Sequence, residues 1–248
     1  MLLGLAATAA AAAAPVATGS LRQCVWKFNS LRKIGGHAAR AEGAPQLTRD
    51  PAVLFDGQDD VLFIDDHPLA RAATFTTELV FRPDGGAFEQ RLLHLESAES
   101  PPVEPGKGST RMLIEIRVVE SHWYLDAFMI GAGYRATMMV PDKLFPIGRW
   151  YHAAATYDGQ VFRSFVNGEL QMEMATPFSP QGPGRASVGA RMNRVSFFKG
   201  AIREARFTRE ALPVKAFMQV PQAVVSRTGF GNSSASSTAP TATAADPT

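Results

Sequence analysis

The sequence lacks the residues and patterns that several classes of function require. It has one cysteine, Cys24, so no intramolecular disulfide can form. Its five histidines show neither the H-x-H nor the H-x-x-x-H spacing that places two zinc ligands on one element. Its 25 basic and 23 acidic residues leave a formal net charge of +2, without the Lys/Arg clusters that bind nucleic acids or anionic membranes. These absences argue against a disulfide scaffold, a zinc site and a nucleic acid partner.

Long hydrophobic runs are also missing. The alanine-rich start, residues 1–20, is too weakly apolar for a membrane span, which needs roughly 20 strongly apolar residues. Small residues at Ala12 and Ala14, and again at Ala17 and Gly19, match the cleavage site of a signal peptide. No Lys or Arg precedes this run. We predict a leader over residues 1–20, a secreted or periplasmic protein, and no membrane span in the mature chain.

The other end of the chain is poor in apolar residues. Ser, Thr, Ala and Pro dominate residues 226–248, so this segment cannot bury enough surface to offset its ordering entropy. We therefore predict a disordered tail there and a folded domain over residues 21–225. We interpret Cys24 as a small hydrophobic residue near the first strand of that domain.

The middle of the chain consists of short β-like runs separated by Gly, Pro and Asp. Alternation over 74–82 places Phe75, Leu79 and Phe81 on one strand face, and alternation over 112–119 separates apolar from charged side chains. Further strands are expected at 25–28, 53–55, 61–64, 90–96, 123–130, 150–157, 162–166, 187–190 and 201–208. Only 141–145 and 210–218 could form short helices. Such a pattern predicts an all-β protein, a sandwich or barrel of many short strands.

Four stretches carry motifs that point to a known family. The first is the turn Phe55-Asp56-Gly57 followed by Asp59-Asp60, which looks like FDG-x-D-D. The others are 75–83, 150–159 running into 165–168, and 198–212, which look like FT-x-E-x-W-x-R-P, WYH-x-A-x-x-YDG … YVNG and F-x-G-x-I-D-E-V-R-I … A-L. With these motifs the sequence resembles the bacterial laminin-G-like jelly-roll family of the concanavalin A-like class. The resemblance implies a two-sheet antiparallel β-sandwich. Lectin-like binders, adhesion modules, polysaccharide hydrolases and polysaccharide lyases share this fold.

No recognised catalytic motif accompanies the resemblance. The sequence has no E-x-D-x-x-E strand, whose glutamates would act as nucleophile and acid. A looser group, His94, Tyr124, Glu115 and Arg117, lies on neighbouring expected strands. In an enzyme, Arg117 would neutralise a uronic acid carboxylate while Tyr124 or His94 moved a proton. The alternative is a surface ion pair of Glu115 with Arg117 and a structural histidine.

Binding residues can be proposed on the same strands. Aromatic rings that stack on sugars and polar groups beside them favour Trp123, Tyr124, Asp126 and Arg117 as ligand-binding residues, with Tyr134 as a further aromatic candidate.

A metal site is the remaining candidate. Asp56, Asp59 and Asp60 cluster on one turn and offer the oxygen ligands that calcium prefers. The alternative is that Asp is simply frequent in turns. Calcium is the one cofactor that the sequence suggests.

Taken together, these features favour a non-catalytic carbohydrate-binding or adhesion module of the bacterial cell envelope or secretome, with a glycan as its partner. Two alternatives stay open: a polysaccharide-active hydrolase or lyase on the same fold, and a domain that binds a protein partner.

Overall fold

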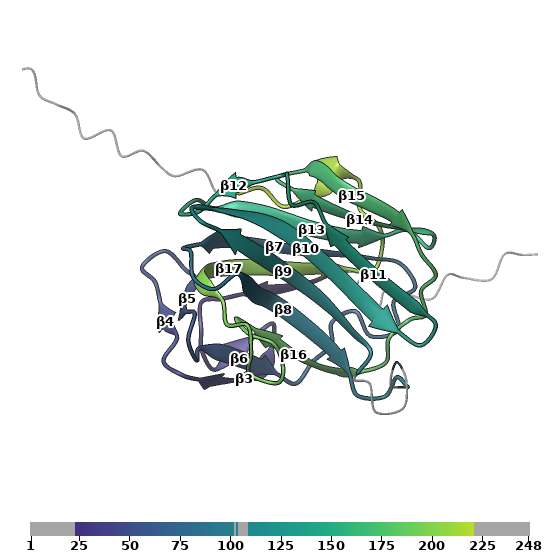
Figure 1. The fold of residues 1–248 in the computed structure, drawn as a ribbon. Coiled ribbons are helices and arrows are strands. Elements are labelled where there is room, and N and C mark those ends of the chain that lie inside the picture. Colours follow the sequence, from purple (N-terminus) through teal and green to yellow (C-terminus); the bar gives the residue numbers. More distant parts are fainter. Residues whose placement is uncertain (1–22, 102, 104–108, 221–248) are drawn as a thin grey trace, which may run out of the picture.

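The computed structural model describes residues 23–101, 103 and 109–220. Over these residues, two antiparallel β-sheets face each other and form the predicted all-β sandwich (Figure 1). The predicted leader, 1–20, and the predicted tail, 226–248, lie outside the described residues. No helix in the described part has the length and hydrophobicity needed to cross a membrane.

The first sheet has eight strands and is built around the last strand of the domain, β17 (Lys199–Thr208). β17 pairs with β7 along one edge and with β1 and β5 along the other. The order is β15 (Glu169–Ala175), β14 (Val161–Val166), β13 (Tyr151–Tyr157), β7 (Phe75–Pro83), β17, β5 (Val53–Asp56) and β4 (Gln46–Leu47), with β1 (Gln23–Lys27) on β17.

The second sheet has nine strands and contains a meander of four consecutive strands, β8 to β11, which lies at the front of Figure 1. The order is β11 (Tyr134–Met139), β10 (His122–Gly131), β9 (Arg111–Val119), β8 (Glu89–Ser97), β16 (Gly184–Val188), β6 (Val61–Ile64), β3 (His37–Glu42) and β2 (Lys33–Ile34), with β12 (Phe145–Pro146) on β10.

The core lies between the sheets and follows the alternation of the strands. On β7, Phe75, Leu79 and Phe81 are buried in the core, as predicted. Ile114 and Ile116 meet them from β9. Burial of each such side chain contributes about 1.5–3 kcal/mol. The same alternation leaves charged residues of β9 on the outer face of the nine-stranded sheet.

Residues 53–64 form the two expected strands, but these lie in different layers: β5 belongs to the eight-stranded sheet and β6 to the nine-stranded sheet. The turn therefore carries the chain from one layer to the other. The expected helix at 210–218 is only a 3₁₀ turn, Val214–Ala216, and 141–145 is not helical. Segments this short gain too few backbone hydrogen bonds to nucleate a helix.

Two strands near the sheet edges, β3 and β15, were not predicted from the sequence. β3 has the sequence HAARAE and β15 the sequence ELQMEMA, both with largely exposed side chains. Ala, Glu and Gln are weak strand formers. Pairing with β6 and β14 decides their conformation. Asn167 and Gly168 form the tight turn between β14 and β15, with φ of 50° and 80°.

Candidate functional site

Charged side chains gather on the outer face of the nine-stranded sheet where β8, β9 and β10 lie side by side. Two rows cross these strands. In one row, Asp126 on β10 lies opposite Glu115 on β9, which lies opposite Arg91 on β8. In the other row, Arg117 on β9 lies opposite Glu89 on β8. Strand register therefore assembles five charged groups from three segments.

The five groups form one ion-pair network. Arg91 Nε lies 2.9 Å from Glu115 Oε1, and Arg91 Nη2 lies 2.5 Å from Glu89 Oε1. Arg117 Nη2 lies 2.6 Å from Asp126 Oδ2, and Arg117 Nη1 lies 3.2 Å from Glu115 Oε2. All but Glu89 are largely buried. Such a network is costly to desolvate, so its net contribution to folding is small.

Burial also sets the protonation of the two inner acids. Glu115 and Asp126 are each only 2% exposed. Burial raises the pKa of Glu115 to about 8, and the neighbouring charge of Asp126 acts in the same direction, against Arg91 and Arg117. Burial raises the pKa of Asp126 as well. The pair therefore retains a proton near neutral pH, because two adjacent buried carboxylates do not both ionise readily.

His94 lies on the same outer face but cannot act as a base near neutral pH. It is 2% exposed, and its Nδ1 accepts a hydrogen bond of 3.0 Å from the Met192 backbone N–H. Burial, together with the smaller effect of the Arg111 charge, lowers the pKa of His94 to about 3. The ring is therefore neutral with its proton on Nε2. Among the described residues, this Nε2 has no hydrogen-bond partner.

The predicted site residues are thus brought together only in part. Glu115, Arg117 and Asp126 form one cluster, and Tyr124 lies opposite Arg117 in the register. His94 shares the face, but it lies opposite Leu113 rather than beside the acids.

Trp123 does not fit the predicted ligand-binding role. It points into the core, is 0% exposed, and packs edge-on against Phe81 and Tyr151 with ring centroids 5.1 and 5.0 Å apart. Alternation along β10 places it on the face opposite Tyr124. Tyr134 is also buried, against Phe178. Neither ring is available for stacking on a sugar.

An exposed aromatic ring that the sequence analysis missed lies beside the cluster. Phe88 is 56% exposed, and the Arg117 guanidinium carbon lies 5.9 Å from the centre of its ring. Phe88 directly precedes β8, and its carbonyl accepts a hydrogen bond from Val118 N–H. Its place after Gly85-Gly86 suggested only a loop.

Arginines extend the charged face beyond the network. Arg111 and Arg135 both lie over the ring of Phe128, at 5.3 and 5.7 Å from its centre. Arg191 lies at the same depression. Alternation along β9 indicates that Arg111 shares a face with Glu115. The contributions from β11 and the 189–198 loop depend on the tertiary fold.

These side chains line an open depression of about 270 Å³ on the outer face. Its lining combines five arginines, two acids and a few apolar or hydroxyl side chains, namely Arg91, Arg111, Arg117, Arg135, Arg191, Glu115, Asp126, Leu113, Phe128, Thr137 and Met139. Such a surface can hold a ligand that carries both hydroxyl groups and charge.

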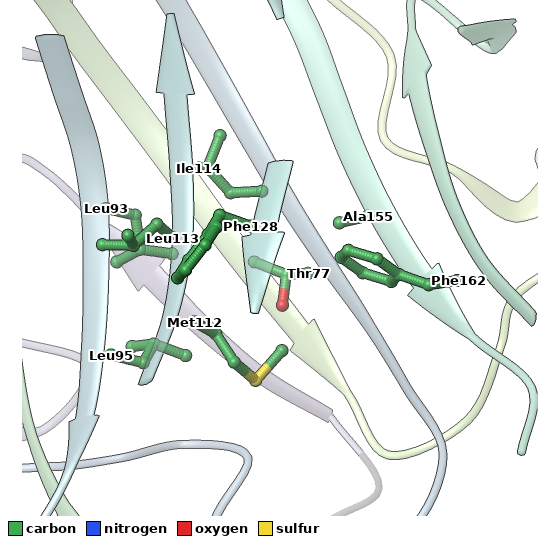
Figure 2. A pocket seen from close by; sticks show the side chains of 9 residues that line it. All are labelled: Thr77, Leu93, Leu95, Met112, Leu113, Ile114, Phe128, Ala155 and Phe162. Atoms are coloured by element: carbon green, nitrogen blue, oxygen red, sulfur yellow. The ribbon is translucent and has the colours of Figure 1, made fainter. Parts of the chain in front are cut away.

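A second space, against the core, is too small for a ligand. Nine side chains, all apolar except Thr77, surround about 10 Å³ (Figure 2). This is room for about one water molecule. We assign it to imperfect packing between strands of the two sheets.

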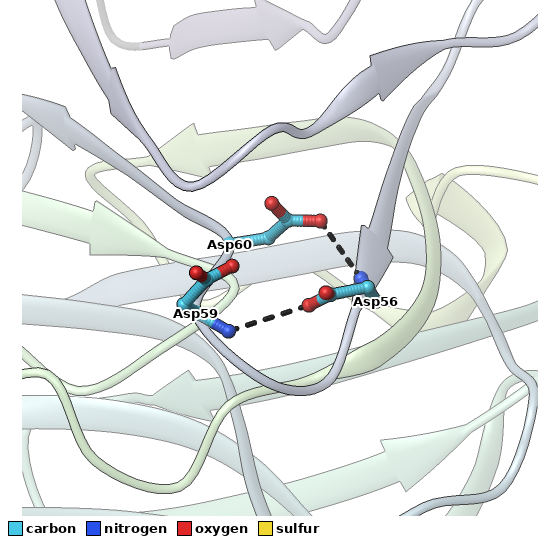
Figure 3. Close-up of side chains that lie close together, drawn as sticks. All are labelled: Asp56, Asp59 and Asp60. Atoms are coloured by element: carbon cyan, nitrogen blue, oxygen red, sulfur yellow. Dashed lines mark hydrogen bonds between the residues drawn. The ribbon is translucent and has the colours of Figure 1, made fainter.

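The predicted calcium ligands do meet. Asp56, Asp59 and Asp60 each place a carboxylate oxygen within 4.8 Å of the others (Figure 3). Asp60 accepts hydrogen bonds from Ala44 N–H at 2.6 Å and Asp56 N–H at 2.9 Å, and Asp56 accepts one from Asp59 N–H at 3.3 Å. These bonds fix the crossing between the sheets. The geometry fits a structural turn, and calcium binding there stays a prediction.

A second buried acid lies on the outer face of the other sheet. Glu78 on β7 is 0% exposed and accepts hydrogen bonds from His152 Nε2 at 3.0 Å, Met218 N–H at 2.7 Å and Arg206 Nε. Burial alone would raise the pKa of Glu78, but these donors outweigh burial and lower it. The Phe217 ring packs against His152. This cluster fastens the segment after β17 onto the sheet.

A family model described as the concanavalin A-like lectin/glucanases superfamily matches residues 56–216 of this sequence. The chain belongs to this superfamily. The match agrees with the two-sheet sandwich and with the resemblance found in the sequence. A search of the curated proteins finds no significant match.

Solved structures with the superfamily fold are similar to the chain at low sequence identity. Domain 4 of AbnA, a GH43 extracellular arabinanase from Geobacillus stearothermophilus, solved with arabinotriose, has a TM-score of 0.56 and 17% identity, covering 77% of this chain and 94% of that one. The CBM40 of a Ruminococcus gnavus IT-sialidase has a TM-score of 0.50 and 13% identity, covering 66% and 92%. The binding domain of botulinum neurotoxin DC, solved with SialylT, has a TM-score of 0.52 and 11% identity, covering 78% and 49%. At these identities the likeness is one of fold.

Proposed function

We propose that this protein is a non-catalytic carbohydrate-binding module whose glycan lies across the outer face of β8, β9 and β10. The observation that carries this proposal is the open depression on that face, lined by a charged network. Arg117 and Asp126 offer donors and acceptors for sugar hydroxyls, and Tyr124 borders them. Phe88 offers an exposed ring for stacking on a pyranose.

The similar structures support this choice of ligand class. Arabinotriose was bound to the arabinanase domain, and SialylT to the neurotoxin domain. We propose glycan binding here on the same fold, with residues of this chain's own depression as contacts.

A glycan-array screen of the full chain, in calcium and again in EDTA, tests the proposal. Binding to a defined glycan, weakened by Arg117→Ala and unchanged by Arg163→Ala, is the expected result. Arg163 is a matched control because it pairs with Asp158 on the other sheet. Failure to bind any glycan in either buffer would refute the proposal.

One observation favours an enzyme as the second candidate. Glu115, with a pKa near 8, lies beside Asp126, and such a pair could donate and accept a proton. Release of reducing ends or unsaturated products from a bound polysaccharide, lost in Glu115→Gln, would establish catalysis. His94 has no part in this scheme.

A protein-binding role has less support. The large exposed apolar side chains in the described part of the chain come from separate elements, such as Leu47 on β4, Met139 on β11 and Leu170 on β15. Export also remains a proposal, made from residues 1–20. N-terminal sequencing of protein recovered outside the cytoplasm, starting near residue 20, would support it.

A further inference from the structure

Buried donors without acceptors lie next to the ion-pair network. Among the described residues, His94 Nε2, Arg91 Nη1 and Arg111 Nε are buried and have no hydrogen-bond partner. Because His94 Nδ1 accepts from Met192 N–H, the Nε2 atom carries the proton and is a donor. A buried donor without an acceptor costs about 1–3 kcal/mol. Arg91 and Arg111 also line the depression, where a bound ligand could supply an acceptor.

Positive charge in the same region is also uncompensated. Arg111, Arg135 and Arg191 make no ion pair with a carboxylate in the part of the chain that the structure describes, whereas Arg185 is paired with Glu96 at 3.0 Å. Burial lowers the pKa of Arg111, and the charge of Arg191 lowers it further. These like charges raise the energy of the free protein, and a bound anion would relieve their repulsion.

The geometry points to a subsite for one anionic group, a carboxylate or a sulfate, held by Arg111, Arg135 and Arg191 at the depression. The inference rests on the proposed glycan-binding function and specifies its ligand class as acidic glycans. Carboxylate and sulfate share the chemistry that guanidinium groups recognise.

The acids of the network limit the size of this anionic group. Glu115 and Asp126 line the same depression beside the arginines, so a continuous polyanion would meet carboxylates there. The depression therefore fits an oligosaccharide with a single acidic sugar. That sugar would lie against the arginines, and the neutral sugars next to it would lie over Glu115, Asp126 and Phe88. We therefore expect acidic oligosaccharides to bind more tightly than densely charged polymers of equal length.

The test is affinity measurement with the full chain and matched ligands. Oligogalacturonate, its methyl-esterified and therefore neutral form, and a sulfated oligosaccharide are the glycan probes, and inorganic sulfate probes the anion subsite alone. The variants are Arg135→Gln, whose side chain is exposed, and Arg111→Gln with Arg191→Gln. Arg185→Gln, which removes an arginine already paired with Glu96, is the control.

We expect the carboxylated or the sulfated glycan to bind, the neutral ester to bind more weakly, and the double variant to lose at least about 10-fold in affinity. The control variant should keep wild-type affinity. Which of the two acidic probes binds identifies the anionic group.

Failures of the two proposals can be told apart. Equal binding of the acid and the ester, unchanged in the arginine variants, would overturn the anionic subsite and leave glycan binding intact. If no glycan binds while sulfate raises the melting temperature of the wild type but not of Arg135→Gln, the subsite stands and the glycan function fails. If neither glycan nor sulfate binds, both are overturned.

Discussion

The two outer faces of the sandwich bury charged groups in different ways. On the eight-stranded sheet, Glu78 receives three donors, one of them from Met218 in the segment after β17. On the nine-stranded sheet, Glu115 and Asp126 share their arginines in an open depression, and donors beside them, such as His94 Nε2, lack acceptors in the described chain.

The difference separates a structural role from a binding role. Glu78 and Glu115 both lie mid-strand in sequences rich in apolar residues, so local sequence pattern does not distinguish them. Their hydrogen bonds do distinguish them. A buried polar group whose partners all lie within the protein stabilises the fold, whereas an unsatisfied group beside solvent can bind a ligand.

The largest expected effect comes from removing Glu78. Glu78→Ala leaves Arg206 and His152 without their buried partner, and we expect a loss of about 3–5 kcal/mol in the free energy of unfolding. Denaturant unfolding measures it. Glu173→Ala, which removes the exposed partner of Arg163, should cost less than about 1 kcal/mol. Equal losses in the two variants would contradict the assignment of Glu78 as a structural clamp.

The second prediction concerns pH and Glu115. Its pKa rises from 4.5 to about 8 on folding, so the folded protein keeps a proton that the unfolded chain releases in this window. Stability should therefore fall as pH rises from 4.5 to about 8, by at most about 1.4 kcal/mol per pH unit from this group.

Glu115→Gln, which resembles the protonated acid, should remove that part of the slope. Unfolding free energies across the window measure the change. Glu120→Gln, at an exposed turn position between β9 and β10, should keep the wild-type slope. An unchanged slope in Glu115→Gln would mean that Glu115 is ionised throughout.

The third prediction concerns calcium at the crossing between the sheets. If calcium binds, saturation at 100 times its dissociation constant should add about 2.7 kcal/mol to stability over EDTA. Asp59→Ala should abolish this increment, because it removes one of the three carboxylates. Asp59 suits this test, because no hydrogen bond to its carboxylate is found among the described residues. Equal melting temperatures in calcium and EDTA would show that the three carboxylates serve only the turn.

The smallest effect is expected at Phe88. Phe88→Ala should weaken glycan binding by about 0.5–1.5 kcal/mol, or roughly 2- to 12-fold, through loss of ring stacking. Its stability should stay near that of the wild type, since the side chain is exposed. Leu144→Ala, also exposed, is the control for surface apolar loss. Unchanged affinity in Phe88→Ala would indicate that the glycan does not contact Phe88.

Much of the fold could be predicted from local pattern. Alternation at β7 and β9 gave strand positions and the inward faces, because side chains of a strand alternate with a period of two and only one face meets the core. Strands β3 and β15 could not be found in this way, because pairing with a neighbour determines their conformation.

The candidate site was predictable only where one strand carried it. Glu115 and Arg117 were found because they alternate with core residues on β9. Arg91 was missed because a bulge between Arg91 and Leu93 interrupts the alternation of β8. Trp123 was misassigned because sequence does not show which face of β10 meets the core when both carry aromatic rings.

The sequence by itself determined the class of fold, the inward faces of β7 and β9 and the pairing of acids with arginines along β9, since all three follow from residue spacing. Only the tertiary structure decided which charges are satisfied. Hydrogen bonds to Glu78 from Met218, and the gathering of Arg111, Arg135 and Arg191 at one depression, join residues far apart in the chain. Such long-range contacts depend on the order of strands in the sheets and on the paths of the loops, which the spacing of residues within one strand does not encode.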